Sequence, residues 1–334
     1  MSPTSSSASD ASSSTDSPAV TASNRPQEAN WWPDASLVGV ALIWGINIPV
    51  MKNGLEDVNH YFFNAVRLAV SVIVLLSFAL RERARGKRMS ADLPRRKVIV
   101  YSLIVSGLYQ WLFLMGIDNT TSGNTALIIS TIPMWTALLA RMFLKDKLAV
   151  LSWCGLVVAL AGTVVVALQK GDVSANAEHL TGNLFILACA IAWAAGTVYS
   201  RPMLTQISPM QLSGYAAAMA LPLHLYLGFS HGRADWSALQ SVELWMIILY
   251  SGVLSTGLAL PMWSYGVRHA GPAHAAIMQN MVPVIAIVAA WITRGESATT
   301  PQLLGGGLIL TGLFVMRKGR SLREKKERLA AQTA

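Results

Sequence analysis

Charged residues are scarce in this sequence, at 13% of 334 positions. An average soluble domain carries roughly 25% charged residues. Here 53% of the residues are hydrophobic and the mean hydropathy is +0.45, which excludes an ordinary soluble domain and indicates a membrane protein. The net charge of +9 does not favour nucleic-acid binding, because the basic residues lie between apolar runs and near the C-terminus. Basic residues in those places set membrane orientation.

Cysteine and intramembrane acids are also rare. Cys154 and Cys189 both lie inside apolar runs, and two isolated cysteines cannot build a disulfide framework or a metal cluster. No apolar run has an aspartate or glutamate near its centre. Proton- and sodium-coupled carriers often use such carboxylates, so this lack argues against carboxylate-based coupling. We expect no cofactor and no metal, while facilitated export or coupling through His274 stays open.

Residues 1–34 lack the basic n-region and the apolar core of a signal peptide. They are rich in Ser, Ala, Thr and Asp. Such a composition buries too little apolar surface to fold. We predict a disordered N-terminal tail.

Ten apolar runs are long enough to cross a bilayer, which takes about 20 residues as a helix. No run shows the strict alternation of a barrel strand. We therefore predict an all-α integral membrane protein with ten transmembrane helices. The runs are 35–53, 61–80, 98–117, 122–144, 149–168, 182–201, 209–229, 244–265, 272–293 and 300–317.

The basic residues predict the orientation of these helices. With the N-terminus inside, most of the 26 basic residues fall on the inner side, including the loop "RERARGKRMSADLPRRK" and the "KDK" turn. This bias predicts a multi-pass protein of the plasma or inner membrane with both termini cytoplasmic. Residues 318–334 then form a basic cytoplasmic C-terminal tail.

The two halves of the chain repeat each other. Most matches are 150 residues apart, and Trp44 matches Trp193 at a shift of 149. The first half (35–168) and the second half (182–317) hold five helices each. Because five is odd, the second half must enter the membrane from the opposite side, an arrangement common in secondary transporters. The matched pairs are Gly107 and Gly257, Gly116 and Gly266, Pro133 and Pro283, Asp146 and Glu296, Gly155 and Gly305, and Gly162 and Gly312.

These motifs resemble the EamA family of the drug/metabolite transporter superfamily. The resemblance is carried by "WGINIPVMK" in the first helix, by "P…KDKL…G…G" across the fourth and fifth, and by its copy "P…RGES…G…G" across the ninth and tenth. It covers roughly 36–317 and implies a ten-helix exporter or permease of small metabolites, often amino acids or related compounds.

The sequence departs from the family pattern in places. Asp146 stands where glutamate is usual, and Arg67 has no basic equivalent near Ala216 or Ala217. The two halves are therefore not chemically identical at the depth of Arg67.

Polar and aromatic side chains inside the runs are the candidates for a substrate site. Polar groups in hydrocarbon are costly and usually face the bundle interior or a wet cavity. The candidates are Trp44, Asn47, Arg67, Gln110, Asn124, Trp193, His274, Gln279 and Asn280.

Several of these candidates have two readings. Trp44 and Asn47 share a helix face, and Trp44 with Trp193 either flanks an apolar substrate or anchors helix packing. Gln110 hydrogen-bonds either a substrate or a neighbouring helix. Arg67 lies about two turns into its helix, so it needs a water path, a partner or an anionic substrate.

Asn124 and His274 are repeat equivalents near the starts of the two proline-bearing helices. Helix N-termini attract anionic groups, and histidine titrates near neutral pH. The alternatives are an end-cap role for Asn124 and an interfacial position for His274. Gln279 and Asn280 lie deeper in the same helix as His274.

Pro133 and Pro283 interrupt apolar runs, where each removes a backbone donor. Such a fault is tolerated where neighbouring helices or a water-filled cavity satisfy the freed carbonyl. We predict that both helices bend at these prolines and line a central cavity, and that Pro283 leaves the carbonyl of Gln279 free. Small residues at 155, 162 and 305–307 predict close helix packing, within one protomer or between two, so a homodimer stays open.

We predict a multi-pass transporter of a small amphipathic metabolite such as an amino acid, with the bilayer and the solute as its partners, and not an enzyme. The positive residues near the candidate cavity would tolerate a carboxylate. The alternative is a membrane-embedded enzyme acting on lipid-linked substrates, but the sequence has no acid, histidine or serine constellation at one depth. A receptor or scaffold is a third class, for which the tails are short.

Overall fold

The computed structural model describes most of the chain. The described residues are 31–54, 58–87, 89–120, 122–146, 148–168, 177–230, 236–294 and 299–333. Trp32–Ala334 forms one compact unit, and Met1–Trp31 is a separate unit. The predicted tail lies outside the described residues up to position 30, and its last three residues, 32–34, belong to the first helix.

Every regular element in these ranges is helical. The elements are α1 (Trp32–Gly54), α2 (His60–Ala84), α3 (Arg95–Ser102), η1 (Leu103–Leu108), α4 (Tyr109–Ile117), α5 (Ser122–Ile129), α6 (Ile132–Phe143), α7 (Val150–Leu168), η2 (Ala177–His179), α8 (Leu180–Met203), α9 (Pro209–Ser230), η3 (Ala238–Gln240), α10 (Val242–Leu249), η4 (Tyr250–Leu258), α11 (Ala259–Ala270), α12 (Pro272–Met278), α13 (Met281–Arg294) and α14 (Thr300–Thr333).

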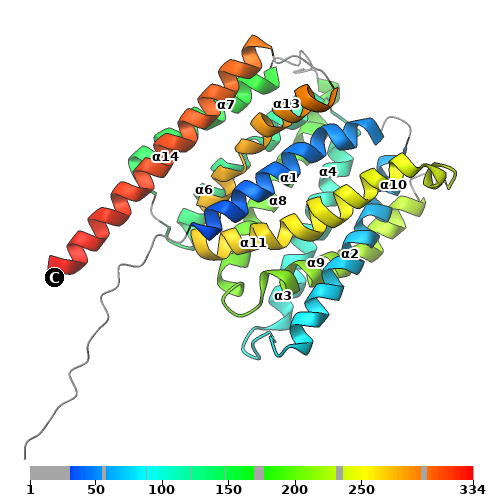
Figure 1. Cartoon of the computed structure of the whole chain (residues 1–334), viewed down its shortest axis with the longest axis horizontal. Coiled ribbons are helices and arrows are strands. Elements are labelled where there is room, and N and C mark those ends of the chain that lie inside the picture. The colour runs from blue at the N-terminus through cyan, green and yellow to red at the C-terminus, as the bar shows by residue number, and fades with distance from the viewer. Residues whose placement is uncertain are drawn as a thin grey trace, which may run out of the picture. The chain divides into compact units, whose positions relative to one another are not determined.

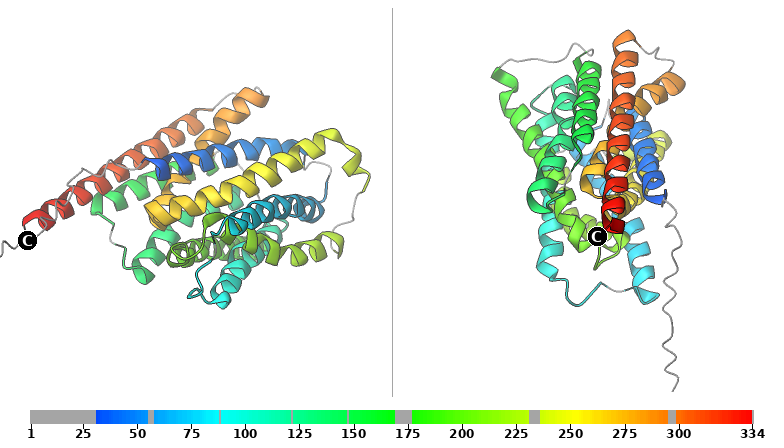
Figure 2. Two further views of the ribbon diagram at one scale, coloured as in Figure 1. Left: turned by 60° about the horizontal axis from the view of Figure 1, so that its bottom comes forward. Right: turned by 90° about the vertical axis from the view of Figure 1, so that its left-hand side faces the viewer.

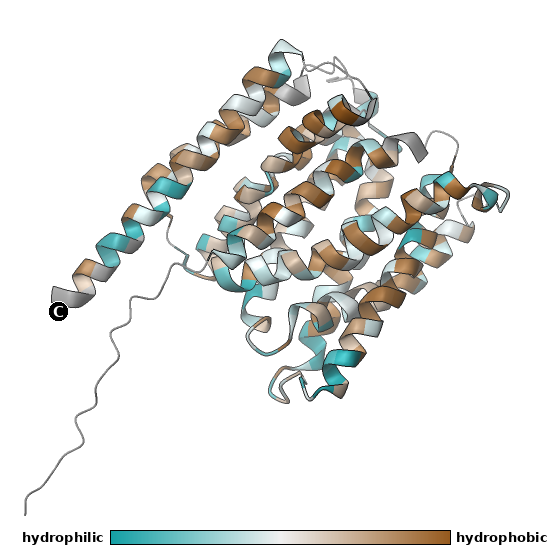
Figure 3. Ribbon diagram, viewed as in Figure 1, coloured by the Kyte–Doolittle hydropathy of each residue, from teal (hydrophilic) through white to brown (hydrophobic). Residues whose placement is uncertain are grey.

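Eight helical segments of the described chain are long and apolar enough to cross a membrane, and Val150–Val165 is a shorter apolar helix. Large apolar side chains such as Ile73 and Ile292 are exposed on these helices. Polar residues gather in the connections and in the last part of α14 (Figure 3). Helices suit a bilayer because they satisfy their own backbone groups. The all-α class is confirmed, while the count of ten spanning helices stays a prediction.

Two spanning segments contain π-helical turns at equivalent places. η1 joins α3 to α4, and η4 joins α10 to α11. The matched glycines Gly107 and Gly257 lie in these two segments. A π-helical turn is rare and often marks a functional site. The same irregularity therefore recurs in both halves.

Both proline-bearing helices are interrupted beside the proline. α5 ends at Ile129 and α6 begins at Ile132, so that Pro133 lies in its first turn. In the second half α12 ends at Met278 and α13 begins at Met281. Gln279 is not left with a free carbonyl there, because it accepts a bond of 3.0 Å from the N–H of Val282. A tight turn, rather than a cavity, satisfies this carbonyl.

Glycines join α7 to α14. An added Cβ on Gly155 would lie 2.5 Å from the carbonyl oxygen of Gly312, and one on Gly162 would lie 2.5 Å from that of Gly305. The first glycine of each helix thus meets the second glycine of the other, so the helices are antiparallel, as repeat equivalents in inverted halves must be. Figures 1 and 2 show the two helices side by side, with the C-terminal part of α14 extending beyond α7. These four glycines pack within one chain.

Candidate functional site

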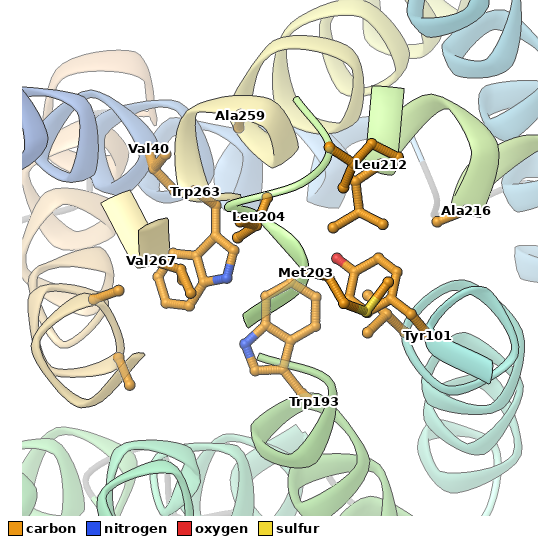
Figure 4. Packing of buried hydrophobic residues seen from close by; sticks show 14 of the residues in the cluster. Val40, Tyr101, Trp193, Met203, Leu204, Leu212, Ala216, Ala259, Trp263 and Val267 are labelled. Atoms are coloured by element: carbon orange, nitrogen blue, oxygen red, sulfur yellow. The ribbon is translucent and has the colours of Figure 1, made fainter. Parts of the chain in front are cut away.

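Three tryptophans from three helices form an aromatic cluster. Trp44 of α1, Trp193 of α8 and Trp263 of α11 have ring centroids 5.6 to 5.8 Å apart. Figure 4 shows Trp193 and Trp263 directed toward one another, with Met203 and Tyr101 nearby. Trp44 and Trp193 are the predicted repeat equivalents, and the structure brings them into edge-to-face contact. Such contacts add about 0.5–1.5 kcal/mol to the burial of the rings.

The cluster continues onto α4 and η4. The ring of Tyr109 lies 4.9 Å from that of Trp193, and Phe113 stacks on Tyr109 at 6.4 Å. The indole N–H of Trp44 donates to the carbonyl oxygen of Ser255 at 2.9 Å. That bond fixes the ring of Trp44 against the π-helical segment.

Arg67 is held by neutral acceptors. The cap residue Asn59 accepts from the N–H of Tyr61 and starts α2, and Arg67 lies two turns further along. Its Nη1 donates to Oγ1 of Thr256 at 3.1 Å, and its Nη2 donates to Oδ1 of Asn64 at 2.6 Å and to Oε1 of Gln110 at 3.4 Å. Arg67 thus joins α2, α4 and η4.

The buried His224 contacts Asn64, one of the acceptors of Arg67. Nε2 of His224 lies 2.8 Å from the carbonyl oxygen of Ser106, and Nδ1 lies 3.3 Å from Nδ2 of Asn64. Because the carbonyl can only accept and the amide N–H₂ can only donate, this arrangement fits a neutral imidazole that donates from Nε2. His224 therefore orients Asn64, which in turn holds Arg67.

The aromatic and polar groups adjoin through two pairs of consecutive residues. Ser255 accepts from Trp44, and the next residue, Thr256, accepts from Arg67. Tyr109 contacts Trp193, and the next residue, Gln110, accepts from Arg67. One site therefore presents a guanidinium beside a set of indole and phenol rings.

Buried polar atoms without a partner concentrate in the predicted residues. Burying a polar atom without a hydrogen bond costs about 1–3 kcal/mol, so native proteins rarely leave one unpaired. Five of the predicted residues each carry an atom that has no partner in the described part of the chain, and a solute or water would satisfy these atoms. The atoms are Asn47 Oδ1, Arg67 Nε, Trp193 Nε1, Gln279 Oε1 and Asn280 Nδ2.

Asn47 lies on the same face of α1 as Trp44, and the start of α13 packs against α1 at Gly45. A Cβ on Gly45 would lie 3.1 Å from the carbonyl oxygen of Val282 and would overlap Ile285. The start of α13 is therefore packed against α1 between Trp44 and Asn47. Nδ2 of Asn47 donates to Sδ of Met51 at 3.0 Å, and its Oδ1 is the unpaired atom.

Asn124 and His274 do not join Arg67. Asn124 donates to Oγ1 of Thr120 at 3.2 Å, and Thr120 donates to Oδ1 of Asn183 at 2.6 Å. Asn183 precedes Trp193 by ten residues of α8, which is about 15 Å along a helix. Asn124 thus belongs to one end of the bundle.

His274 belongs to the other end. Its Nε2 lies 2.8 Å from Oδ1 of Asp34, and Nη2 of Arg317 lies 3.8 Å from Oδ2 of the same carboxylate. Asp34 precedes Trp44 by ten residues of α1, again about 15 Å. The sequence prediction treated this aspartate as part of the tail and missed it as the partner of His274.

A cavity of about 290 Å³ lies beside His274. Asp146 of the connection after α6 meets Arg201 in the last turn of α8 and His269 in the last turn of α11 there, together with Arg320 of α14. The basic-residue count places the connection and these helix ends on one face. This grouping fits the predicted orientation. Glu296, the repeat equivalent of Asp146, lies outside the described residues.

The sequence prediction missed Asn64 and Tyr109, and it did not select Thr256 and Trp263 as site members although they match the face of Gln110 in the repeat. Asn64 precedes Arg67 by three residues, which puts both on one helix face. Thr256 and Trp263 are the repeat equivalents of Ser106 and Phe113. The spacing of three residues within the helix and the repeat spacing of 150 residues were the sequence signals that could have identified Asn64, Thr256 and Trp263.

Two sets of helices, one from each half of a duplicated membrane protein, thus enclose a polar and aromatic site, which is the architecture of a polytopic transporter. The model of the EamA-like transporter family matches residues 31–168 and 180–318. The chain belongs to this family.

Known relatives are transporters. The chain is 26% identical over 280 residues to the uncharacterized transporter YoaV of Bacillus subtilis, covering 84% of this chain and 94% of that one. It is 25% identical over 294 residues to a probable terminal-alkyne amino-acid exporter of Streptantibioticus cattleyicolor, covering 87% and 95%. It is 24% identical over 288 residues to the uncharacterized inner membrane transporter YedA of Escherichia coli, covering 86% and 91%.

A solved structure has the same fold. A crystal structure of a protein that is 19% identical superposes with a TM-score of 0.74, covering 86% of this chain and 98% of that one. The family and these relatives make the present chain a membrane transporter.

Proposed function

We propose that this transporter moves small amphipathic metabolites, such as amino acids or related compounds, by alternating access between two inverted halves. The observation that carries this proposal is the site around Arg67 and Trp193, which draws on helices of both halves and holds unpaired buried polar atoms. An amphipathic solute offers apolar surface to the rings and polar groups to those atoms. One relative is named as an amino-acid exporter, which supports the same class.

The protein is expected in the plasma or inner membrane with both termini in the cytoplasm. The grouping of Asp146, Arg201 and His274 around one cavity supports this orientation. Flux in proteoliposomes tests the function. Purified protein should move labelled amphipathic solutes, and Asn47→Ala or Gln110→Ala should reduce the flux. A folded protein that moves no solute of a broad panel would refute the proposal.

A further inference from the structure

Arg67 is a half-buried cation whose described partners are all neutral. A guanidinium is charged at any ordinary pH, and a charge at membrane depth needs compensation. Asn64, Gln110 and Thr256 supply oxygen atoms without a formal charge. No ion pair links Arg67 to a carboxylate anywhere in the described ranges.

Asp118, at the end of α4, already has a hydrogen-bond partner. Oδ2 of Asp118 accepts from the hydroxyl of Tyr61 at 2.7 Å. Tyr61 lies six residues before Arg67 in α2, which corresponds to about 9 Å along the helix axis. Asp118 therefore does not serve as the counter-ion of Arg67.

One edge of the guanidinium has an unused donor. Nε of Arg67 is buried and has no hydrogen-bond partner among the described residues. The adjacent Nη2 makes its second bond to Gln110 at 3.4 Å, which is long for a hydrogen bond. A carboxylate accepts two parallel bonds from such an edge. Of the two bonds that Nη2 makes, the long one to Gln110 is the easier for such a carboxylate to replace.

Building on the proposed transport function, we propose that Arg67 binds a carboxylate of the transported solute through its Nε–Nη2 edge. The apolar body of the solute then lies against Tyr109 and Trp193, since Tyr109 is adjacent in sequence to Gln110 and contacts Trp193. The solute is thus a carboxylate with an apolar body. An amine or alcohol of the same shape leaves the cation without its counter-ion.

Counterflow in proteoliposomes tests this with matched solutes. The probes are the twenty standard amino acids and, for each one that moves, the amino alcohol that lacks the carboxylate. We expect each carried acid to exceed its alcohol by at least about tenfold, as for loss of a charge-assisted hydrogen bond. Arg67→Gln should reduce this ratio to near one, and Arg67→Lys should restore part of it. Arg81→Gln, at the exposed end of the same helix, is the matched control.

The results of these experiments distinguish a failure of the proposed role of Arg67 from a failure of the proposed transport function. Flux of alcohols or simple amines equal to that of the acids, or an unchanged ratio in Arg67→Gln, overturns the role of Arg67 and leaves transport intact. No flux of any probe from correctly folded wild type counts against the proposed function itself. Thermal unfolding in detergent supplies a second readout, because a carried acid should stabilise wild type but not Arg67→Gln.

A second inference stands on a different observation. Asp34 and Asn183 are 149 residues apart, as are Trp44 and Trp193, and Asn124 and His274 are 150 apart. The contact of Asp34 with His274 at one end therefore has a repeat equivalent at the other, where Thr120 bridges Asn124 and Asn183. Each contact joins the first helix of one half to the proline-bearing helix of the other half.

We infer that these contacts are the two gates of the site, with Asp34 and His274 closing one face and Asn124, Thr120 and Asn183 the other. Each lies about 15 Å from the tryptophan cluster along its helix. Breaking one gate should open the site to that face only. This inference rests on alternating access, but its test needs no knowledge of the solute.

Labelling from each side of the membrane tests the gates. A cysteine in place of Asn47 reports access to the site, in a background with the exposed Cys154 and the buried Cys189 both replaced by alanine, because Cys189 packs with Tyr109 of the site. Asp34→Asn should raise maleimide labelling from the cytoplasmic side, and Asn183→Ala should raise it from the opposite side. Asp92→Asn, at an exposed position in the connection between α2 and α3, is the control. Labelling that is unchanged, or that rises on the same side in both variants, overturns the inference.

Discussion

Gly155 and Gly312 meet backbone to backbone, with only 2.5 Å between an added Cβ on the first and the carbonyl oxygen of the second. Backbone cannot turn aside as a flexible side chain can. Gly155→Ala should therefore destabilise the protein by about 1–3 kcal/mol, the usual cost of overpacking. Thermal unfolding in detergent measures this. Gly307→Ala in α14 meets nothing within 4 Å, and alanine is the better helix former, so the melting temperature should stay the same or rise. Equal melting of the two variants would refute the close packing.

Asn64→Asp should stop transport. The new carboxylate would take the place of an oxygen that lies 2.6 Å from Nη2 of Arg67, and so supply a permanent counter-ion that competes with the carboxylate of the solute. The unfolding temperature should stay close to that of wild type, because the gain of an ion pair is offset by the loss of the bond from Nδ2 of Asn64 to Nδ1 of His224, where a carboxylate cannot donate. Asn64→Asp protein that still carries amino acids at the wild-type rate would argue against binding at Arg67. Flux and melting are measured on the same preparation.

Trp44→Phe should cost about 1 kcal/mol and impair transport. The phenyl ring keeps part of the aromatic contact but loses the bond from the indole N–H to Ser255, whose carbonyl oxygen is then left with one partner fewer. Trp291→Phe provides the comparison, since Trp291 is 59% exposed on α13. Unfolding and counterflow should change in the first variant only. A similar loss in both variants would point to a general effect of removing tryptophan.

Pro133→Ala should alter transport more than folding. The proline follows the interruption between α5 and α6, and alanine would allow a continuous helix there. We expect a changed maximal rate with a melting temperature close to that of wild type. Pro283→Ala should act in the same way, because it stands at the equivalent interruption before α13. Unchanged kinetics in both variants would speak against a hinge at these positions.

Much of the architecture could be predicted from the sequence, because a bilayer allows few structures. Apolar runs of helical length must be helices, and the matched pairs Pro133 and Pro283 or Gly155 and Gly305 define the two halves without any knowledge of packing. The family likeness rests on the same motifs. The antiparallel contact of α7 with α14 then follows from the inverted order of equivalent glycines.

The site was less accessible to prediction. Trp44, Arg67 and Gln110 could be selected because each is costly or bulky at membrane depth. The residues that contact them could not be predicted, because the periodicity of one helix does not show which neighbouring helix its polar face meets. The π-helical turn of η4 changes the register at Thr256, and the pairing of Asp34 with His274 joins residues 240 positions apart.

α14 extends well beyond what a membrane requires. Its 34 residues span about 51 Å at 1.5 Å per residue, against about 30 Å for the hydrocarbon core. The helix is continuous over its whole length. Near its start lie glycines that pack against α7, and its basic segment follows them. Because α14 is one continuous helix, a small tilt at the glycine contacts would displace its C-terminal end by several ångströms. A spectroscopic probe placed there would report motions of the transporter that are too small to detect inside the bilayer.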